Sequence, residues 1–126
     1  MIDPAYVIGI DPIDADHAEL FALIEQVRQA GAEAEVALAT VQALLDYTRR
    51  HFFREESLMA ENGYPELEAH RQLHRALFRR VLEMEQTLGT GQAQAACDLA
   101  VFLNDWLRGH ILVHDRRYGE FILDHP

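Results

Sequence analysis

The amino-acid sequence predicts an all-α protein: an up-down-up-down antiparallel four-helix bundle with a short C-terminal helical element. Four long segments place apolar residues at steps of three and four, the spacing of an amphipathic α-helix. Breaks of only a few residues divide these segments, and such short turns join antiparallel neighbours. No segment alternates as a half-buried strand would. The 126 residues are expected to form one domain spanning 1–126.

The first helix is expected from about Asp11 to Ala30. Asp11 or Asp14 could cap it, because a short carboxylate side chain accepts hydrogen bonds from the first free amides of a helix. Pro12 suits a first helical turn, and Gly31 ends the segment. This segment therefore has both a start and a stop signal.

The second helix is expected over residues 34–61 and stops at Asn62-Gly63. Pro65 restarts the chain as a third helix that continues to about Leu88, and Gly89-Thr90-Gly91 makes the next turn.

The fourth helix carries apolar residues from Ala96 to Trp106 or Leu107 and reaches His110. A short final element, Arg116 to Leu123, is expected to pack the end of the chain.

Composition excludes several classes of function. The formal charge of −10 argues against nucleic acid and anionic membrane surfaces, both of which attract basic patches. The apolar runs are too short to span a bilayer, and the first residues lack a secretory signal, so a cytoplasmic location is expected. Cys97 stands alone, which excludes an intrachain disulfide and a multi-thiolate metal site.

Potential metal ligands occur on the inner stripe of every predicted helix. The candidates are His17, His51, Glu55, His70, His74, His110 and Asp115. Antiparallel packing would bring all of them to the same end of the bundle. A buried row of imidazoles and carboxylates is costly unless something binds it, and seven donors exceed the need of one ion. The pattern therefore predicts a two-metal centre.

The donor types favour iron or manganese, because imidazole and carboxylate are mixed and no thiolate cluster exists. A structural zinc ion would close at four ligands and leave donors idle. Two six-coordinate ions, bridged by Glu55, Asp115 and an oxo or hydroxo group, would use all seven residues. One coordination position would then stay open for an exogenous ligand. A single histidine in an apolar stripe is more often an ordinary core residue. The prediction therefore rests on finding all seven candidates on inner faces at the same end of the bundle.

The fourth helix fits this prediction least well. His110 and Asp115 are five residues apart, a rotation of about 140° on a regular α-helix, whereas His114 would align with His110. A second bridging carboxylate to balance the metal charge favours Asp115. We therefore expect the helix to end or distort between Ile111 and Asp115 and to turn His114 away. His125, at the chain end, is expected to be solvated.

Together these residues resemble the hemerythrin family, specifically the single-domain bacterial hemerythrins. The resemblance runs from Val7 to Tyr118 and rests on short stretches around the candidate ligands. These stretches are Ile13-Asp14, His17, Leu20-Phe21, His51-Phe52, Glu55-Glu56, Leu58-Met59, Gly63-Tyr64-Pro65, His70, His74, Phe102-Leu103, Trp106-Leu107, His110-Ile111, Asp115 and Tyr118.

The resemblance implies two non-haem iron ions joined by an oxo or hydroxo bridge. His70, His74 and His110 would hold one ion, and His17 and His51 would hold the other, which keeps the vacant position. Glu55 and Asp115 would bridge the ions. The implied function is reversible dioxygen binding for storage, delivery or sensing, and a site rich in neutral imidazole is consistent with it. An apolar pocket would be walled by Leu20, Trp106, Leu107 and Ile111, which could equally be ordinary core residues.

Two positions depart from the family pattern. Ile2 stands where the family often has Trp, and Asp16 stands where it often has Gln. An acid at position 16 could alter the hydrogen bonding around the ligands or simply lie in solvent. An enzyme is the less favoured hypothesis: a di-iron protein acting on peroxide, dioxygen or nitric oxide. A third hypothesis is an oxygen- or redox-responsive regulatory module. The implied partners are dioxygen and an unidentified reductant or oxygen-consuming protein.

Overall fold

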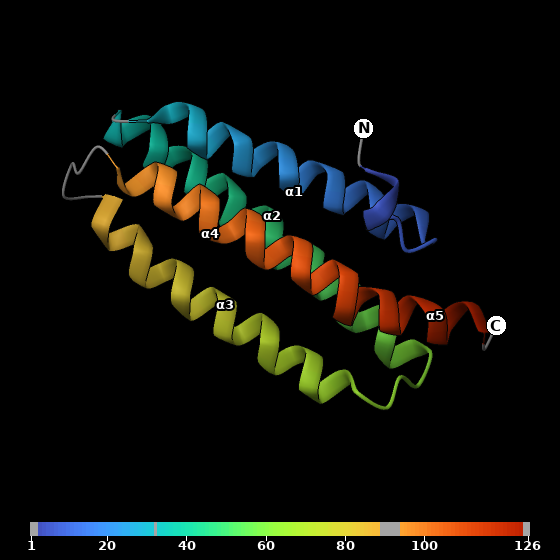
Figure 1. The fold of residues 1–126 in the computed structure, drawn as a ribbon. Helices are drawn as coiled ribbons and strands as arrows, with labels where there is room; N and C mark the ends of the chain where they lie inside the picture. Colours follow the sequence, from blue (N-terminus) through green and yellow to red (C-terminus); the bar gives the residue numbers. More distant parts are fainter. Residues whose placement is uncertain (1–2, 32, 89–93, 125–126) are drawn as a thin grey trace.

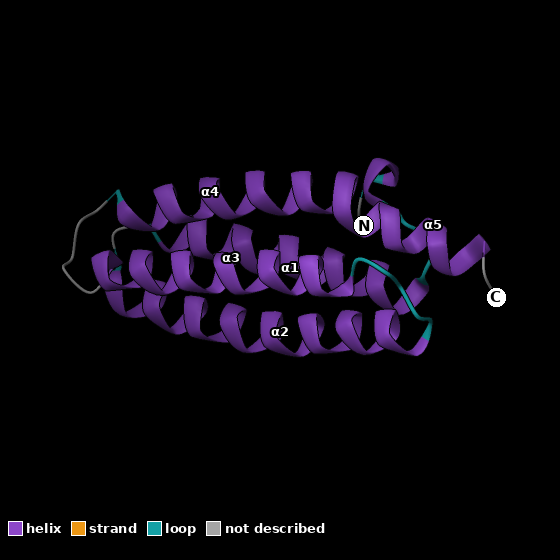
Figure 2. Ribbon diagram, turned by 90° about the horizontal axis from the view of Figure 1, so that it is seen from below, coloured by secondary structure: helices purple, strands orange, loops and turns teal. Residues whose placement is uncertain are grey.

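The computed structural model describes residues 3–31, 33–88 and 94–124. Its long helices are α1 (Asp11–Ala30), α2 (Ala34–Glu61), α3 (Leu67–Leu88) and α4 (Ala95–His110), and a shorter helix, α5 (Arg116–Asp124), follows. Within the described residues there is no strand, as Figure 2 also shows. The predicted all-α fold class is confirmed.

The four long helices form a closed ring of neighbours. Helix α1 packs against α2 and α4, and α3 packs against the same two helices. The chain runs up and down through the bundle, so the start of α1, the end of α2, the start of α3 and the end of α4 lie together (Figure 1). The connection between α2 and α3 is at this end, and α5 extends beyond it.

Helix α3 begins two residues later than the sequence suggested. Pro65 and Glu66 remain in the turn, and helical hydrogen bonding starts only with the bond from the His70 amide to the Glu66 carbonyl. The buried ring of Tyr64 explains the delay, since it packs edge-on against Tyr118 at a centroid distance of 6.3 Å. That contact holds the chain in the turn before the helix can start.

The start of α1 also differs from expectation, because neither Asp11 nor Asp14 caps it. Ile10 occupies the cap position and has no side-chain hydrogen bond to offer. The carboxylate of Asp14 turns back instead and accepts hydrogen bonds from the amides of Ile8, at 2.8 Å, and Gly9, at 3.1 Å. Asp14 therefore fixes the N-terminal segment against the helix.

Helix α4 distorts where the sequence predicted. Residues Ile111–Asp115 form one π-helical turn, closed by a hydrogen bond from the Arg116 amide to the Ile111 carbonyl. Such turns contain one residue more than an α-helical turn and often occur at functional sites. They bring residues five apart onto one face, so Asp115 lies beneath His110.

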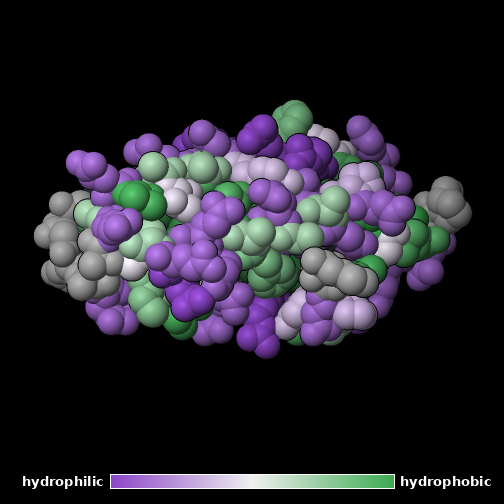
Figure 3. All heavy atoms as spheres, turned by 90° about the horizontal axis from the view of Figure 1, so that it is seen from above, coloured by the Kyte–Doolittle hydropathy of each residue, from purple (hydrophilic) through white to green (hydrophobic). Residues whose placement is uncertain are grey.

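The interior of the bundle is divided along its length. One half is aliphatic, with fully buried residues such as Val27, Val41 and Leu99. The other half contains the buried polar side chains. On the face drawn in Figure 3 hydrophilic side chains predominate, and apolar ones form separate patches. None of the described helices is both long and apolar enough to cross a membrane.

Three sequence-based expectations concern residues outside the described ranges. These are the turn at Gly89-Thr90-Gly91, the solvation of His125 and the departure at Ile2.

Candidate metal centre

The structure brings all seven candidate ligands together at one end of the bundle interior. Their exposed fractions lie between 0 and 4%. Each long helix contributes to the cluster from the end that Figure 1 places beside the α2–α3 connection. The members are His17, His51, Glu55, His70, His74, His110 and Asp115.

The ligand atoms fall into two groups that share one residue. His70, His74, His110 and Asp115 form the first group, and within it the donor atoms all lie within 4.8 Å of one another. The second group meets the same limit and consists of His17, His51, Glu55 and Asp115. We refer to these as the three-histidine group and the two-histidine group.

The two carboxylates lie between the groups. Oδ1 of Asp115 is 3.1 Å from Nε2 of both His70 and His110, whereas its Oδ2 is 3.0 Å from Nε2 of His17. Oε1 of Glu55 is 2.7 Å from Nε2 of His51 and 3.8 Å from Nε2 of His74. Each carboxylate therefore contacts histidines of both groups, as a bridging ligand would.

The cluster leaves buried polar atoms without hydrogen bonds. Among the described residues, all but one of the buried side-chain atoms with no hydrogen-bond partner belong to it. These atoms are both ring nitrogens of His17, Oε1 of Glu55, Nε2 of His74 and both oxygens of Asp115. Buried polar groups are normally paired, because leaving one unsatisfied costs about 1–3 kcal/mol. Except for Nδ1 of His17, these atoms belong to the groups whose ligand atoms lie within 4.8 Å of one another, so they fit a bound metal.

His114 stays outside both groups, as expected from the distortion of the helix. Its ring is 5.4 Å from that of His110 and 6.3 Å from that of His70, centroid to centroid, and the residue is only half-buried. The π-helical turn therefore exchanges His114 for Asp115 on the inner face.

The electrostatics of the cluster favour ionised carboxylates. Burial would raise the pKa of Asp115, but His110, His17 and His70 outweigh it and hold that pKa well below its ordinary value. Burial would likewise lower the pKa of His51, yet the carboxylates of Glu55 and Asp16 raise it to about 10. Burial dominates at His74 and lowers its pKa to about 3. Without metal, a proton on His51 therefore balances part of the carboxylate charge.

Hydrogen bonds outside the cluster orient two of its histidines. Nδ1 of His51 is 2.8 Å from Oδ2 of Asp16, and Nδ1 of His74 is 2.8 Å from Oε2 of Glu56. A carboxylate on one ring nitrogen fixes the tautomer and strengthens the other nitrogen as a donor. The sequence marked Asp16 as a departure that could alter the hydrogen bonding around the ligands, and the contact with His51 confirms that alternative. No role was predicted for Glu56. The only signal for Glu56 was its position directly after the candidate ligand Glu55.

Tyr118 is a further contact that sequence reasoning missed. Its hydroxyl donates to Oε2 of Glu55 over 2.5 Å, and the side chain is completely buried. Burial and the nearby carboxylates of Glu55 and Asp115 raise the pKa of Tyr118 far above its ordinary value, so the hydroxyl keeps its proton. The signal was its spacing, one helical turn after Asp115.

Replacing Tyr118 with Phe is expected to destabilise the protein by about 1.5–3 kcal/mol, the range for a hydrogen bond to a charged group. Chemical denaturation would measure the loss. Tyr64→Phe is the matched control, because it removes the same atom from a 3.3 Å bond to Glu66 near the surface. Equal free energies of unfolding for the two variants would contradict a special role for Tyr118.

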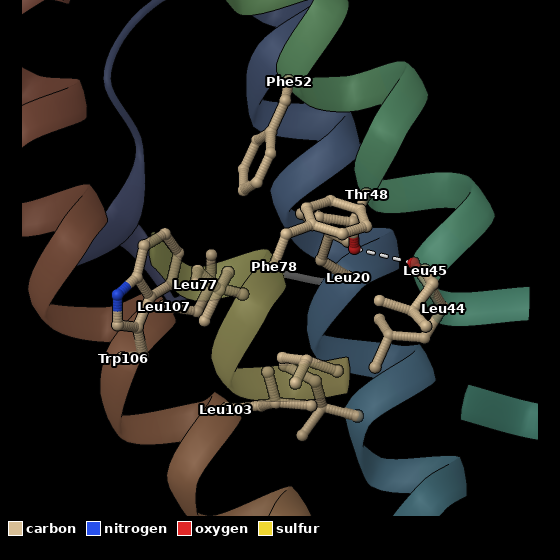
Figure 4. A pocket seen from close by; sticks show the side chains of 12 residues that line it. Leu20, Leu44, Leu45, Thr48, Phe52, Leu77, Phe78, Leu103, Trp106 and Leu107 are labelled. Atoms are coloured by element: carbon tan, nitrogen blue, oxygen red, sulfur yellow. Dashed lines mark hydrogen bonds between the residues drawn. The ribbon is translucent and has the colours of Figure 1, made fainter. Parts of the chain in front are cut away.

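An apolar cavity with about 30 Å³ of free space adjoins the cluster. Figure 4 shows its side chains converging from all four long helices. Two lining rings also contact the cluster: Phe52 stacks on His74 at 3.6 Å, and Trp106 stacks on His110 at 4.3 Å, centroid to centroid. The hydroxyl of Thr48 in the lining donates to the Leu44 carbonyl.

Three of the four residues proposed from the sequence as pocket walls line this cavity, namely Leu20, Trp106 and Leu107. Ile111, in the π-helical turn, is completely buried but is not among the lining residues. Phe52 lines the cavity without having been proposed as a wall.

Comparison with known proteins matches this geometry to one family. The model of the hemerythrin HHE cation binding domain matches residues 8–122. Bacteriohemerythrin of Stenotrophomonas maltophilia is 32% identical over 120 residues, which cover 94% of this chain and 78% of that protein. Bacteriohemerythrin of Pseudomonas aeruginosa is 33% identical over 116 residues, covering 90% and 75% of the two chains.

A crystal structure of wild-type hemerythrin superposes with a TM-score of 0.81 at 27% sequence identity. The superposition covers 90% of this chain and 88% of that one. Because the family match spans nearly the whole bundle and includes every member of the buried cluster, the chain belongs to the hemerythrin family.

Proposed function

We propose that this protein binds dioxygen reversibly at a non-haem di-iron centre. The observation that carries the proposal is the pair of ligand groups joined by two carboxylates. His70, His74 and His110 would hold one iron, His17 and His51 the other, and Glu55 and Asp115 would bridge them, beside an oxo or hydroxo group. Two adjacent ferrous ions can supply two electrons to dioxygen and recover them when it leaves.

The unequal numbers of histidines support an open position. The carboxylates contact both groups, so the two-histidine group has one protein donor fewer than its neighbour. That shortage leaves room for one exogenous ligand. Since the cluster is completely buried, such a ligand would have to be small.

The apolar cavity supports dioxygen as that ligand. Its lining offers almost no unsatisfied polar atoms, and a dry apolar cavity favours small neutral molecules over water and ions. Excluding water would also slow the loss of reduced oxygen species from the site. We propose that Leu20, Trp106, Leu107 and the buried Ile111 provide this protection.

Metal analysis combined with an anaerobic optical titration tests the function. Two irons per chain and a coloured species that forms in air and disappears when oxygen is removed would support it. Irreversible oxidation within one exposure would contradict reversible binding. Turnover with peroxide or nitric oxide would favour the di-iron enzyme instead, and an iron-dependent stable complex would favour a regulatory module.

The biological setting is also part of the proposal. We propose one domain over residues 1–126, a cytoplasmic location and a reductant or oxygen-consuming protein as partner. The net charge of −10 disfavours a nucleic-acid partner.

Filling the cavity should weaken oxygen binding without removing iron. Leu20 is 3% exposed and lines the cavity, so Leu20→Phe would place a ring in the free space. Overpacking typically costs about 1–3 kcal/mol. If only the oxygen-bound protein bears this overpacking cost, each 1.4 kcal/mol lowers the oxygen affinity about tenfold. Oxygen equilibrium titration would measure the change.

Leu82→Phe is the control, because the same substitution there falls on a residue that is 43% exposed. Unchanged oxygen affinity in a folded, iron-loaded Leu20→Phe protein would show that the cavity is not the oxygen pocket.

A further inference from the structure

The buried side chain of Asp16 is the centre of a partly buried hydrogen-bond network beside the two-histidine group. Its Oδ2 lies 2.8 Å from Nδ1 of His51 and accepts from Nε of Arg54 at 2.8 Å. Its Oδ1 accepts from Nη2 of Arg54 at 2.6 Å and from the hydroxyl of Tyr47 at 2.9 Å. Tyr47, His51 and Arg54 all lie on α2, at steps of four and three residues, and therefore face α1 together.

This arrangement requires a carboxylate. Asp16 receives four hydrogen bonds and gives none, and only an ionised carboxylate has acceptors on both of its terminal atoms. An amide would place an NH₂ group against two donors. The network therefore cannot form with the Gln that the family often has before its first histidine ligand.

The three-histidine group has a looser counterpart. Glu56 is near Nδ1 of His74 and accepts a single bond from Arg71, at 3.1 Å. The side chain of Glu56 is 25% exposed, compared with 8% for Asp16, so solvent screens its charge more. Because it is less exposed, Asp16 should influence His51 more strongly than Glu56 influences His74.

A buried carboxylate on Nδ1 has two effects on His51. It directs Nε2 toward Oε1 of Glu55, 2.7 Å away, where the candidate ligand atoms converge. Its negative charge also increases the electron donation of the imidazole to a bound metal. The guanidinium of Arg54 opposes the second effect, because it neutralises part of the Asp16 charge.

We propose that Asp16 is a positioning residue that sets the donor strength of His51. Arg54 and Tyr47 hold its carboxylate in place, and we call these two residues the clamp. Through His51, Asp16 tunes how strongly the ion held by the two-histidine group binds an anionic ligand. The inference rests on the proposed di-iron function. It predicts that the charges of Asp16 and Arg54 have opposite effects on the electron density of the ion. Removing the Asp16 charge makes the ion more electron-poor, and removing the Arg54 charge makes it more electron-rich.

Azide binding to the iron-loaded, oxidised protein tests the proposal. We expect Asp16→Asn to lower the azide dissociation constant by roughly tenfold, which corresponds to about 1.4 kcal/mol of stronger binding. Arg54→Gln should raise the constant. Optical titration gives the constants, and iron content and melting temperature are recorded for each variant.

Asp46→Asn is the matched control. It makes the same charge change on α2, the helix that carries His51 and Arg54, but its side chain is 71% exposed and, among the described residues, pairs with Arg49 alone. It should leave the azide constant at the wild-type value. If Asp16→Asn does not retain iron, then Arg54→Gln and Tyr47→Phe decide, because both keep the carboxylate. Tyr47→Phe frees one acceptor without removing a formal charge, so it should raise the constant less than Arg54→Gln does.

Two results would overturn the inference. Azide constants that stay at the wild-type value in iron-loaded Arg54→Gln would show that the clamp has no influence on the ion. Weaker azide binding in both Asp16→Asn and Arg54→Gln would indicate a role in structure alone. In either case wild-type protein that binds two irons and azide leaves the proposed function standing, whereas wild-type protein without iron removes both.

Discussion

Stripping the metal from the loaded protein is expected to lower its melting temperature by roughly 15 °C. An iron pair that binds as one unit, held at 1,000 times its dissociation constant, would stabilise the folded state by about 4 kcal/mol. For a chain of this size each kcal/mol corresponds to roughly 4 °C. Differential scanning calorimetry before and after chelation would measure the shift.

The physical reason is the composition of the buried cluster. Five imidazoles and two carboxylates are withdrawn from water, and several of their atoms have no hydrogen bond. Without metal, these groups bear a desolvation cost that only protons and mutual contacts offset. Since the unfolded chain has no preformed site, metal binding free energy becomes folding free energy. Equal melting temperatures with and without iron would contradict a bound metal in this cluster.

The fold was predictable because the relevant signals are local. Apolar spacing located four helices, and Gly31 and Asn62-Gly63 marked two of the ends. The distortion between Ile111 and Asp115 was predicted from a conflict, since His110 and Asp115 cannot share a face on a regular α-helix, but its π-helical form was not predicted. A contradiction between the spacing of ligands and the helical period was therefore informative in itself.

Of the features that the sequence did not reveal, one is a local turn and two depend on contacts between distant segments. Asp14 turns away from the helix it was expected to cap, because the amides of the N-terminal segment lie within its reach. Tyr64 delays the start of α3 through packing against α5. The clamp on Asp16 requires α1 and α2 to be aligned along their length, which no local pattern encodes.

Replacing Asp115 with Asn is expected to lower the iron content from two ions per chain to one or fewer. The side chain is completely buried, and its two oxygens face different groups of histidines. An amide keeps one oxygen and replaces the other with an NH₂ group, which cannot ligate a metal. Changing a residue that only hydrogen-bonds to a metal ligand lowers metal affinity roughly 10–100-fold, and the loss of iron affinity in Asp115→Asn should be larger.

Metal analysis of purified Asp115→Asn protein would measure this, with Asp105→Asn as the control for the charge change at an exposed position of α4. The stoichiometry also identifies what the carboxylate does. One ion per chain would mean that the remaining oxygen still serves one group and that the two sites fill independently. A complete loss would mean that neither ion is held without the bridge. Two retained ions would exclude bridging by Asp115, because one of its oxygens would then be expendable. Metal binding would then no longer explain why the chain forms a π-helical turn at this point.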